Sequence, residues 1–277
     1  MWPRLFRYAP LAAALVLAPS CREQGAAPKV QLITTACEGP LPLEGATHLR
    51  LRITGEGIST PIERITPVDL LPLDIPVIPP GENRVLEVRA HTGEPSSAGT
   101  VVSVGRSFPF TMPKEGGPSE PVSITLYRVN TFIPLESAQQ PGTCLELIRP
   151  RAGHSATRLA DGRVVVAGGF ELLGVGERET LSSIEILDPR QRTLTSLALL
   201  ESEATKRAFH TASLMLDGRV ALVGGESQSP GGIATPLSTG AVIDPATQRF
   251  QQFSLAEPRS RHAAAIDIAG RILLVGG

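Results

Sequence analysis

Three histidines recur at one position of a repeated motif, and their type and spacing are the first sign of possible chemistry. His154, His210 and His262 each follow an arginine by three positions, and 56 and then 52 residues separate them. An imidazole can ligate a metal ion or carry a proton near neutral pH. Each histidine recurs together with its arginine, however, which is typical of a structural motif. We therefore expect structural histidines, with no catalytic residue, no metal site and no cofactor.

Cysteine chemistry is the second possibility, and it begins near the N-terminus. Two arginines precede an apolar segment at residues 9–18, and the small residues at 18–20 precede Cys21. This order is typical of a secretory signal, and the apolar segment is about half of the roughly 20 residues that a transmembrane helix needs. Its end resembles the lipobox of bacterial lipoproteins, so we expect a signal peptide at 1–20 and a lipid on Cys21. The alternative is an ordinary secretory signal followed by an unrelated cysteine.

Cys37 and Cys144 remain as a pair, because the chain has 3 cysteines in all. An exported protein lies in an oxidising compartment, so we predict that these two residues form a disulfide. In the loop-entropy account the bond would constrain the unfolded chain by about 4 to 5 kcal/mol. Two buried free thiols are the alternative.

The composition favours β-structure and excludes one class of partner. The 277 residues carry a net charge of −1 without a basic stripe, so we expect no nucleic-acid partner. The chain has 27 glycines and 25 prolines, its apolar runs are short, and no long segment keeps a 3.6-residue period. We expect an all-β protein with almost no helix after the signal peptide.

Residues 30–140 alternate apolar and polar side chains, as strands with one buried face do. The expected strands are 30–36, 49–54, 86–91, 101–110, 122–127 and 129–134. The proline-rich stretch 61–80 suits edge strands and extended connections, because proline cannot donate to a central ladder. We expect an immunoglobulin-like β-sandwich preceded by a polar tether at 21–29, with His48 and His91 as solvated strand residues.

Residues 141–277 contain one motif three times, at 151–169, 207–225 and 259–277. In each copy two strands flank a tight turn, and the second strand is an apolar run that ends in a glycine doublet. In the first two copies a third strand stops at an Asp-Pro pair and a fourth strand follows. Four antiparallel strands in a repeat of this length are one β-propeller blade. The residues at the fixed positions are His154, Gly168, Gly169, Asp188, His210, Gly224, Gly225, Asp244, His262, Gly276 and Gly277.

The Arg-x-x-His sequence, the Asp-Gly-Arg turn, the glycine doublet and the Asp-Pro pair resemble the kelch repeat family, including its galactose-oxidase-like bacterial branch. The resemblance covers residues 149–277 and implies propeller blades. The family's tyrosine before Asp-Pro is Leu187 or Ile243 here, and its tryptophan in the fourth strand is Leu194 or Phe250. The copies amount to about 2.3 blades, whereas a propeller closes with four to eight. We expect an incomplete propeller that belongs to a longer protein.

The copper-radical oxidases of that branch need two tyrosines, and Tyr127 is the one tyrosine outside the signal peptide. The loops at 170–181 and 226–237 hold charged residues that we interpret as solvated. These residues are Glu171, Glu177, Arg178, Glu179 and Glu226. For the residues up to Gly277 we therefore expect a binding role and no catalytic activity.

We expect a non-catalytic binding or scaffold lipoprotein, with the sandwich as a spacer and the loop face of the propeller in contact with an unidentified protein or glycan. Arg22 after the lipidated cysteine resembles the pattern of outer-membrane sorting, so the expected location is the cell envelope at the outer membrane. The alternative is a carbohydrate-active oxidase or lyase with catalytic residues in blades beyond Gly277.

Overall fold

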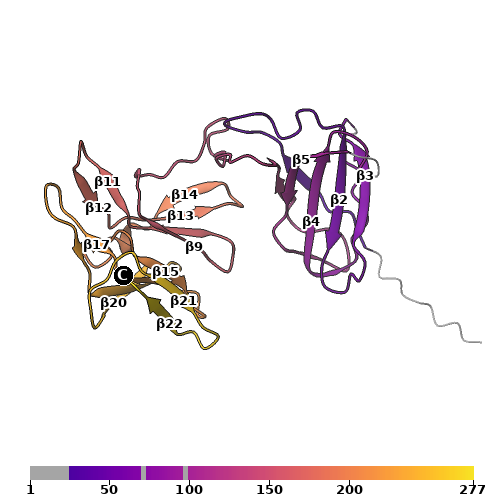
Figure 1. Ribbon diagram of the computed structural model, residues 1–277. Helices are drawn as coiled ribbons and strands as arrows, with labels where there is room; N and C mark the ends of the chain where they lie inside the picture. Colours follow the sequence, from indigo (N-terminus) through magenta and orange to yellow (C-terminus); the bar gives the residue numbers. More distant parts are fainter. Residues whose placement is uncertain (1–24, 70–72, 96–98) are drawn as a thin grey trace, which may run out of the picture.

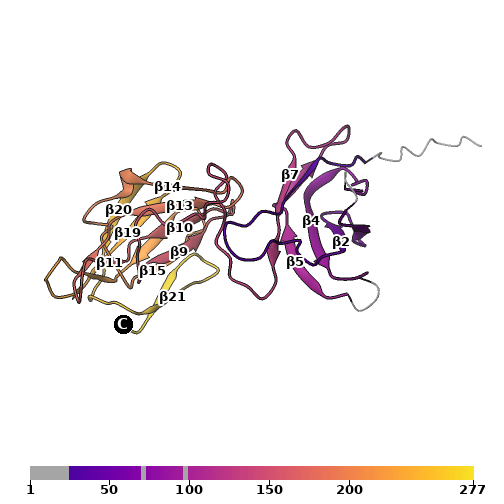
Figure 2. The same ribbon diagram turned by 90° about the horizontal axis from the view of Figure 1, so that it is seen from above.

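The computed structural model describes residues 25–69, 73–95 and 99–277, so the expected signal peptide, Cys21 and the start of the tether lie outside the described residues. Within these ranges the protein is all-β, as predicted, and the one other regular element is the 3-10 helix η1 (Ala198–Leu200). No helix in these ranges is long and apolar enough to cross a membrane. The strands form an N-terminal body (β1–β8) and a C-terminal body (β9–β22), which one connecting segment joins (Figures 1 and 2).

The N-terminal body consists of a six-stranded antiparallel sheet and a two-stranded parallel sheet. The larger sheet has the order β3-β2-β4-β5-β8, and β6 also pairs with β4. Strands β1 and β7 pair in parallel, with Val30 opposite Val122. The strands are β1 (Val30–Ile33), β2 (His48–Thr54), β3 (Ile62–Pro67), β4 (Gly81–His91), β5 (Val101–Arg106), β6 (Phe110–Met112), β7 (Val122–Thr125) and β8 (Tyr127–Arg128).

Alternating side chains form the core of this body, as the sequence predicts. Leu49, Leu51 and Ile53 of β2 are buried in one cluster with Val122 and Ile124 of β7. The polar residues between them point away from the core, because successive side chains of a strand face opposite sides. The proline-rich stretch provides β3, which is an edge strand paired only with β2 among the described residues.

Two expectations for this body are wrong. His91 is not solvated: it is 5% exposed, and its Nδ1 lies 3.3 Å from the carbonyl oxygen of Gly99. The pairing of β4 with β5 shifts register between Ala90 and His91, and such a bulge places consecutive side chains on the buried side. The strand expected at 129–134 does not form, because a turn at Asn130, with a φ of 60°, interrupts the extended chain.

The C-terminal body contains two four-stranded antiparallel sheets, with orders β14-β13-β10-β9 and β15-β16-β19-β20, as the repeats predict. Strands β21 and β22 repeat the first two strands of that pattern. One buried apolar cluster includes residues of both four-stranded sheets, among them Ile184 and Leu222. The strands are β9 (Ser155–Arg158), β10 (Val164–Ala167), β13 (Ile184–Asp188), β14 (Thr193–Ser196), β15 (Thr211–Leu214), β16 (Val220–Val223), β19 (Thr239–Asp244), β20 (Arg249–Ser254), β21 (Ala263–Ile266) and β22 (Ile272–Val275).

Two short hairpins lie between the second and third strands of the sheets, where the sequence predicts only loops. The first pairs β11 (Phe170–Leu172) with β12 (Arg178–Thr180), and the second pairs β17 (Glu226–Ser227) with β18 (Thr235–Pro236). They project on the side of the C-terminal body that lies away from the N-terminal body (Figure 1).

The segment between the bodies is fixed to both of them. Cys37 and Cys144 form the predicted disulfide across 107 residues. Beside it, the buried carboxylate of Glu136 accepts hydrogen bonds from the Thr35 hydroxyl and, at 2.7 Å, from the Gly142 amide. These two donors hold the pKa of Glu136 below its usual value. The same carboxylate lies 3.4 Å from the guanidinium of Arg192 in the C-terminal body, so one side chain links the two bodies and the segment between them.

Candidate functional site

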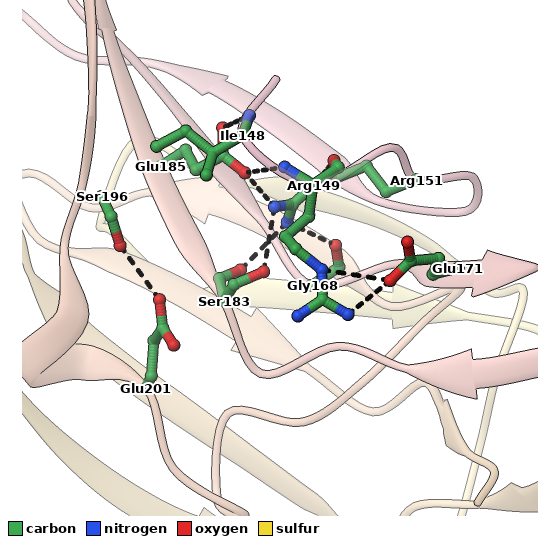
Figure 3. Close-up of polar contacts among 9 residues, drawn as sticks. All are labelled: Ile148, Arg149, Arg151, Gly168, Glu171, Ser183, Glu185, Ser196 and Glu201. Atoms are coloured by element: carbon green, nitrogen blue, oxygen red, sulfur yellow. Dashed lines mark hydrogen bonds and ion pairs between the residues drawn. The ribbon is translucent and has the colours of Figure 1, made fainter. Parts of the chain in front are cut away.

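The arginine that opens each repeat motif holds its sheet together from inside. Arg151 donates to the carbonyl oxygens of Gly168 and Ser183, at 2.8 and 3.0 Å, and pairs with the buried carboxylate of Glu185 (Figure 3). Its side chain is fully buried, and burial lowers its pKa. Glu185 also accepts hydrogen bonds from the amides of Ile148 and Arg149, which start the C-terminal body. Both charged groups of the Arg151–Glu185 pair are therefore buried and bonded within the protein.

Arg207 occupies the same position in the second repeat but has no carboxylate beside it. It donates to the carbonyl oxygens of Gly224 and Thr239, at 2.8 and 3.1 Å, and to that of Ala204 at 2.7 Å. The register places Ala241 where the first repeat has Glu185. Burial of an arginine that has only carbonyl partners lowers its pKa to about 10. The recurring role of this arginine is therefore to hold the ends of the second and third strands.

The repeated histidines form contacts between repeats. The Nε2 atom of His210 lies 2.8 Å from the hydroxyl of Ser155 in the repeat before it, and that of His262 lies 2.9 Å from the hydroxyl of Thr211. Both histidines are buried, and burial, as the largest cause, lowers the pKa of His210 to about 3. His154, in the first repeat, is exposed. The structure therefore uses the two buried imidazoles, in neutral form, as hydrogen-bond partners for the neighbouring repeat.

The described ranges contain no group of three or more His, Cys, Asp or Glu side chains arranged to hold a metal ion.

The glycine doublets lie where the chain of the next repeat passes. Gly168 and Gly224 have φ values of 61° and 59°, a region that disfavours residues with a Cβ. A Cβ on Gly168 would lie 2.2 Å from the carbonyl oxygen of Arg207, and one on Gly224 would lie 2.5 Å from that of Arg259. The third doublet, Gly276 and Gly277, also has positive φ values. Asp188 and Asp244 accept hydrogen bonds from backbone amides two residues further on, which closes the turn after the third strand.

The two hairpins project from the repeats and contact each other. The Thr180 amide donates to the carbonyl oxygen of Gln228, and the Gln228 amide donates to the Thr180 hydroxyl, at 2.9 and 2.8 Å. These bonds hold the hairpins side by side. Their tips present apolar side chains to solvent: Val175 is fully exposed and Ile233 is 90% exposed. We call this surface, formed by residues 170–180 and 226–236, the hairpin face.

A row of aromatic and cationic side chains crosses the base of the hairpin face. Arg178 lies over the ring of Phe170, whose centroid is 5.5 Å from that of Phe209, and Arg261 lies over Phe209 at 3.8 Å. Arg261 also pairs with Glu226 at 3.3 Å. Glu226 is therefore buried against a partner and not a solvated loop charge, because the chain before β21 passes beside β17. Glu171 likewise pairs with Arg149 (Figure 3).

Sequence patterns could not locate this row. Phe209 and Arg261 precede their histidines and have positive φ values, 51° and 58°, which no local pattern indicates. Strands of two or three residues, such as β17 and β11, are too short to show a period.

Comparison with known proteins leaves the family open. No protein-family model matches the chain, and no curated protein matches it. A solved structure described as "Structure of YjhT" aligns with 48% of this chain at 17% sequence identity and a TM-score of 0.37. The alignment covers 36% of that protein's chain.

Proposed function

We propose that this chain is a non-catalytic binding or scaffold protein of the cell envelope. In this proposal residues 30–140 are an immunoglobulin-like spacer, residues 141–277 are kelch-type propeller blades, and a lipid on Cys21 anchors the chain. Four-stranded antiparallel sheets in a repeated order, joined through their first strands, support the blade assignment. Two sheets that share one apolar core support the sandwich assignment.

One observation carries the binding role, which is the exposed apolar tips of the hairpin face. Val175 and Ile233 lie on neighbouring hairpins, and Leu172 beside them is 66% exposed. The hairpins are hydrogen-bonded to each other near their bases, at Thr180 and Gln228, so both exposed tips belong to one linked pair of hairpins. Apolar side chains that gather on a protein surface mark contact sites for other proteins. The two buried histidines, in contrast, are used within the fold.

Site-specific photo-crosslinking tests this role. A photoreactive amino acid replaces Val175 or Ile233 in the full chain, which is expressed in the native host cells. Val77 of the N-terminal body, which is 59% exposed, is replaced in the same way as the matched control. We expect a discrete crosslinked protein from both hairpin positions and none from the control. The same pattern from all three positions, or no adduct at the hairpin tips, would contradict the proposal.

A further inference from the structure

A cleft lies between the two bodies, on the side opposite the hairpin face. Its volume is about 820 Å³, within the range of small-molecule sites, which often form between domains. One wall comes from β5 and β7, which lie on the side of the N-terminal body that faces the C-terminal body (Figures 1 and 2). The other wall is the turn at Pro189, Arg190 and Gln191, between β13 and β14.

Direct contacts hold the two walls together. The guanidinium of Arg190 lies 4.2 Å from the centroid of the Phe108 ring, so each body contributes one member of the stack. Behind the cleft, the Ala138 amide donates to the carbonyl oxygen of Arg192 at 3.1 Å, and Glu136 lies beside the same arginine. The cleft thus lies where direct contacts join the N-terminal body to the C-terminal body.

The charges of the lining favour an anionic ligand. Three arginines, Arg89, Arg106 and Arg190, line the cleft together with Glu87 and Glu120. Arg89 is paired with Glu87 at 2.7 Å. Arg106 is in no salt bridge in the part of the chain that the structure describes, and Arg190, stacked on Phe108, interacts electrostatically with Asp161, which is already paired with Arg163. A guanidinium binds a carboxylate through two parallel hydrogen bonds, and one that is stacked on a ring keeps its N–H edge free for such a contact.

The remaining lining points to a ligand with hydroxyl groups. Ser123 and Tyr127 supply hydroxyls, and the phenol of Tyr127 is protonated at neutral pH, so it can donate a hydrogen bond. The carboxylate of Glu120 would repel a second acid but accepts hydrogen bonds from hydroxyl groups. Phe108 and Val104 add apolar surface. A sugar ring with a single carboxylate satisfies this mixture of donors, acceptors and apolar surface.

We propose that this cleft binds an acidic saccharide, with its carboxylate held by Arg106 and Arg190 and its hydroxyls by the serine, tyrosine and glutamate side chains of the N-terminal body. This site is separate from the hairpin face and does not depend on the partner proposed there. In this proposal the junction between the bodies binds a ligand, and the N-terminal body contributes to that binding in addition to acting as a spacer.

Calorimetric titration of the full chain with digalacturonic acid tests the site. We expect saturable binding that weakens as salt is added, and binding of the neutral disaccharide that is at least about tenfold weaker, because charged hydrogen bonds would be lost. Arg106→Gln and Arg190→Gln should each weaken the binding of the acid by about tenfold or more. Arg158→Gln, which replaces an exposed arginine of β9 outside the cleft, should leave it unchanged.

Melting temperatures show whether the variants fold, and Arg106→Lys provides a second test because it keeps the charge but removes the fork of donors. Partial recovery of binding by Arg106→Lys supports the site. Four results would overturn it: no binding by the wild-type chain, equal binding of the acidic and neutral disaccharides, equal binding by wild type and both glutamine variants, or binding of a diglutamate peptide in place of the saccharide.

Discussion

At the scale of single residues, the repeated motif uses ionisable side chains as buried structural groups. Arg151 has Glu185 as a counter-ion, whereas Arg207 has only carbonyl oxygens. His210 and His262 each hold a hydroxyl of the preceding repeat and leave a buried Nδ1 without a partner among the described residues. The fold accommodates these buried groups in only one protonation state, so the free energy of unfolding should depend on pH through them.

His210 predicts acid sensitivity in a defined window. Its pKa falls from 6.5 to about 3 on folding, so the unfolded chain binds more protons between these values. Stability is therefore complete above pH 6.5 and is lost as the pH falls towards 3, by about 1.4 kcal/mol per unit from this residue. Urea unfolding at about pH 7 and about pH 5, followed by circular dichroism, measures the loss. His210→Gln, which keeps a polar partner for Ser155, should reduce the dependence on pH, and equal slopes for variant and wild type would exclude His210 as its source.

At the scale of elements, the glycine doublets set how closely one repeat approaches the next. Gly168 and Gly169 directly follow β10, and Gly224 and Gly225 directly follow β16. The first glycine of each pair lies beside the carbonyl oxygen of the next repeat's arginine. The Gly169 amide donates to the carbonyl oxygen of Arg207 at 2.9 Å, and the Gly225 amide donates to that of Arg259 at 2.8 Å. The doublets thus connect successive sheets through backbone contacts that a side chain would block.

Gly224→Ala should destabilise the C-terminal body by about 2 to 4 kcal/mol, since it adds both a left-handed strain and an overlap with the Arg259 carbonyl. Gly231→Ala is the matched control, because Gly231 has a φ of 69° but no atom within 4 Å of the position that an added methyl group would occupy. The control should cost only the strain, about 1 kcal/mol. Chemical denaturation of both variants measures the difference. Equal losses would mean that the close approach contributes nothing.

The sequence predicts elements well where a period or a paired motif is present. The strands of β2, β4 and β7 follow from alternation, and the four strands of each complete repeat follow from its turns and doublets. The prediction is wrong at His91, where a bulge breaks the alternation, and at 129–134, where Asn130 turns the chain. The cleft could not be predicted at all, because its walls come from residues far apart in the chain and meet only through tertiary contacts.

At the scale of the whole molecule, the disulfide ties the N-terminal body to the segment between the bodies, whereas the salt bridge of Glu136 reaches the C-terminal body. Replacing Cys37 and Cys144 by alanine should lower the stability of the N-terminal body by about 4 to 5 kcal/mol in the loop-entropy account. Differential scanning calorimetry should show the transition of that body at a lower temperature, while the transition of the C-terminal body stays in place. A shift of both transitions by the same amount would instead show that the junction makes the bodies unfold as one unit.

The parallel pairing of β1 with β7 has a consequence for the order in which the protein can fold. These strands are the first and the penultimate strands of the N-terminal body, and β7 supplies Val122 and Ile124 to its core. The two strands lie near opposite ends of this body's sequence, so the apolar side of β2 and β4 stays uncovered until they have paired. Pairing across so much sequence is slow, and an uncovered sheet is prone to aggregate. Folding of the N-terminal body should therefore be limited by the closing of this distant pair, and the partly folded body should be the state from which aggregation begins.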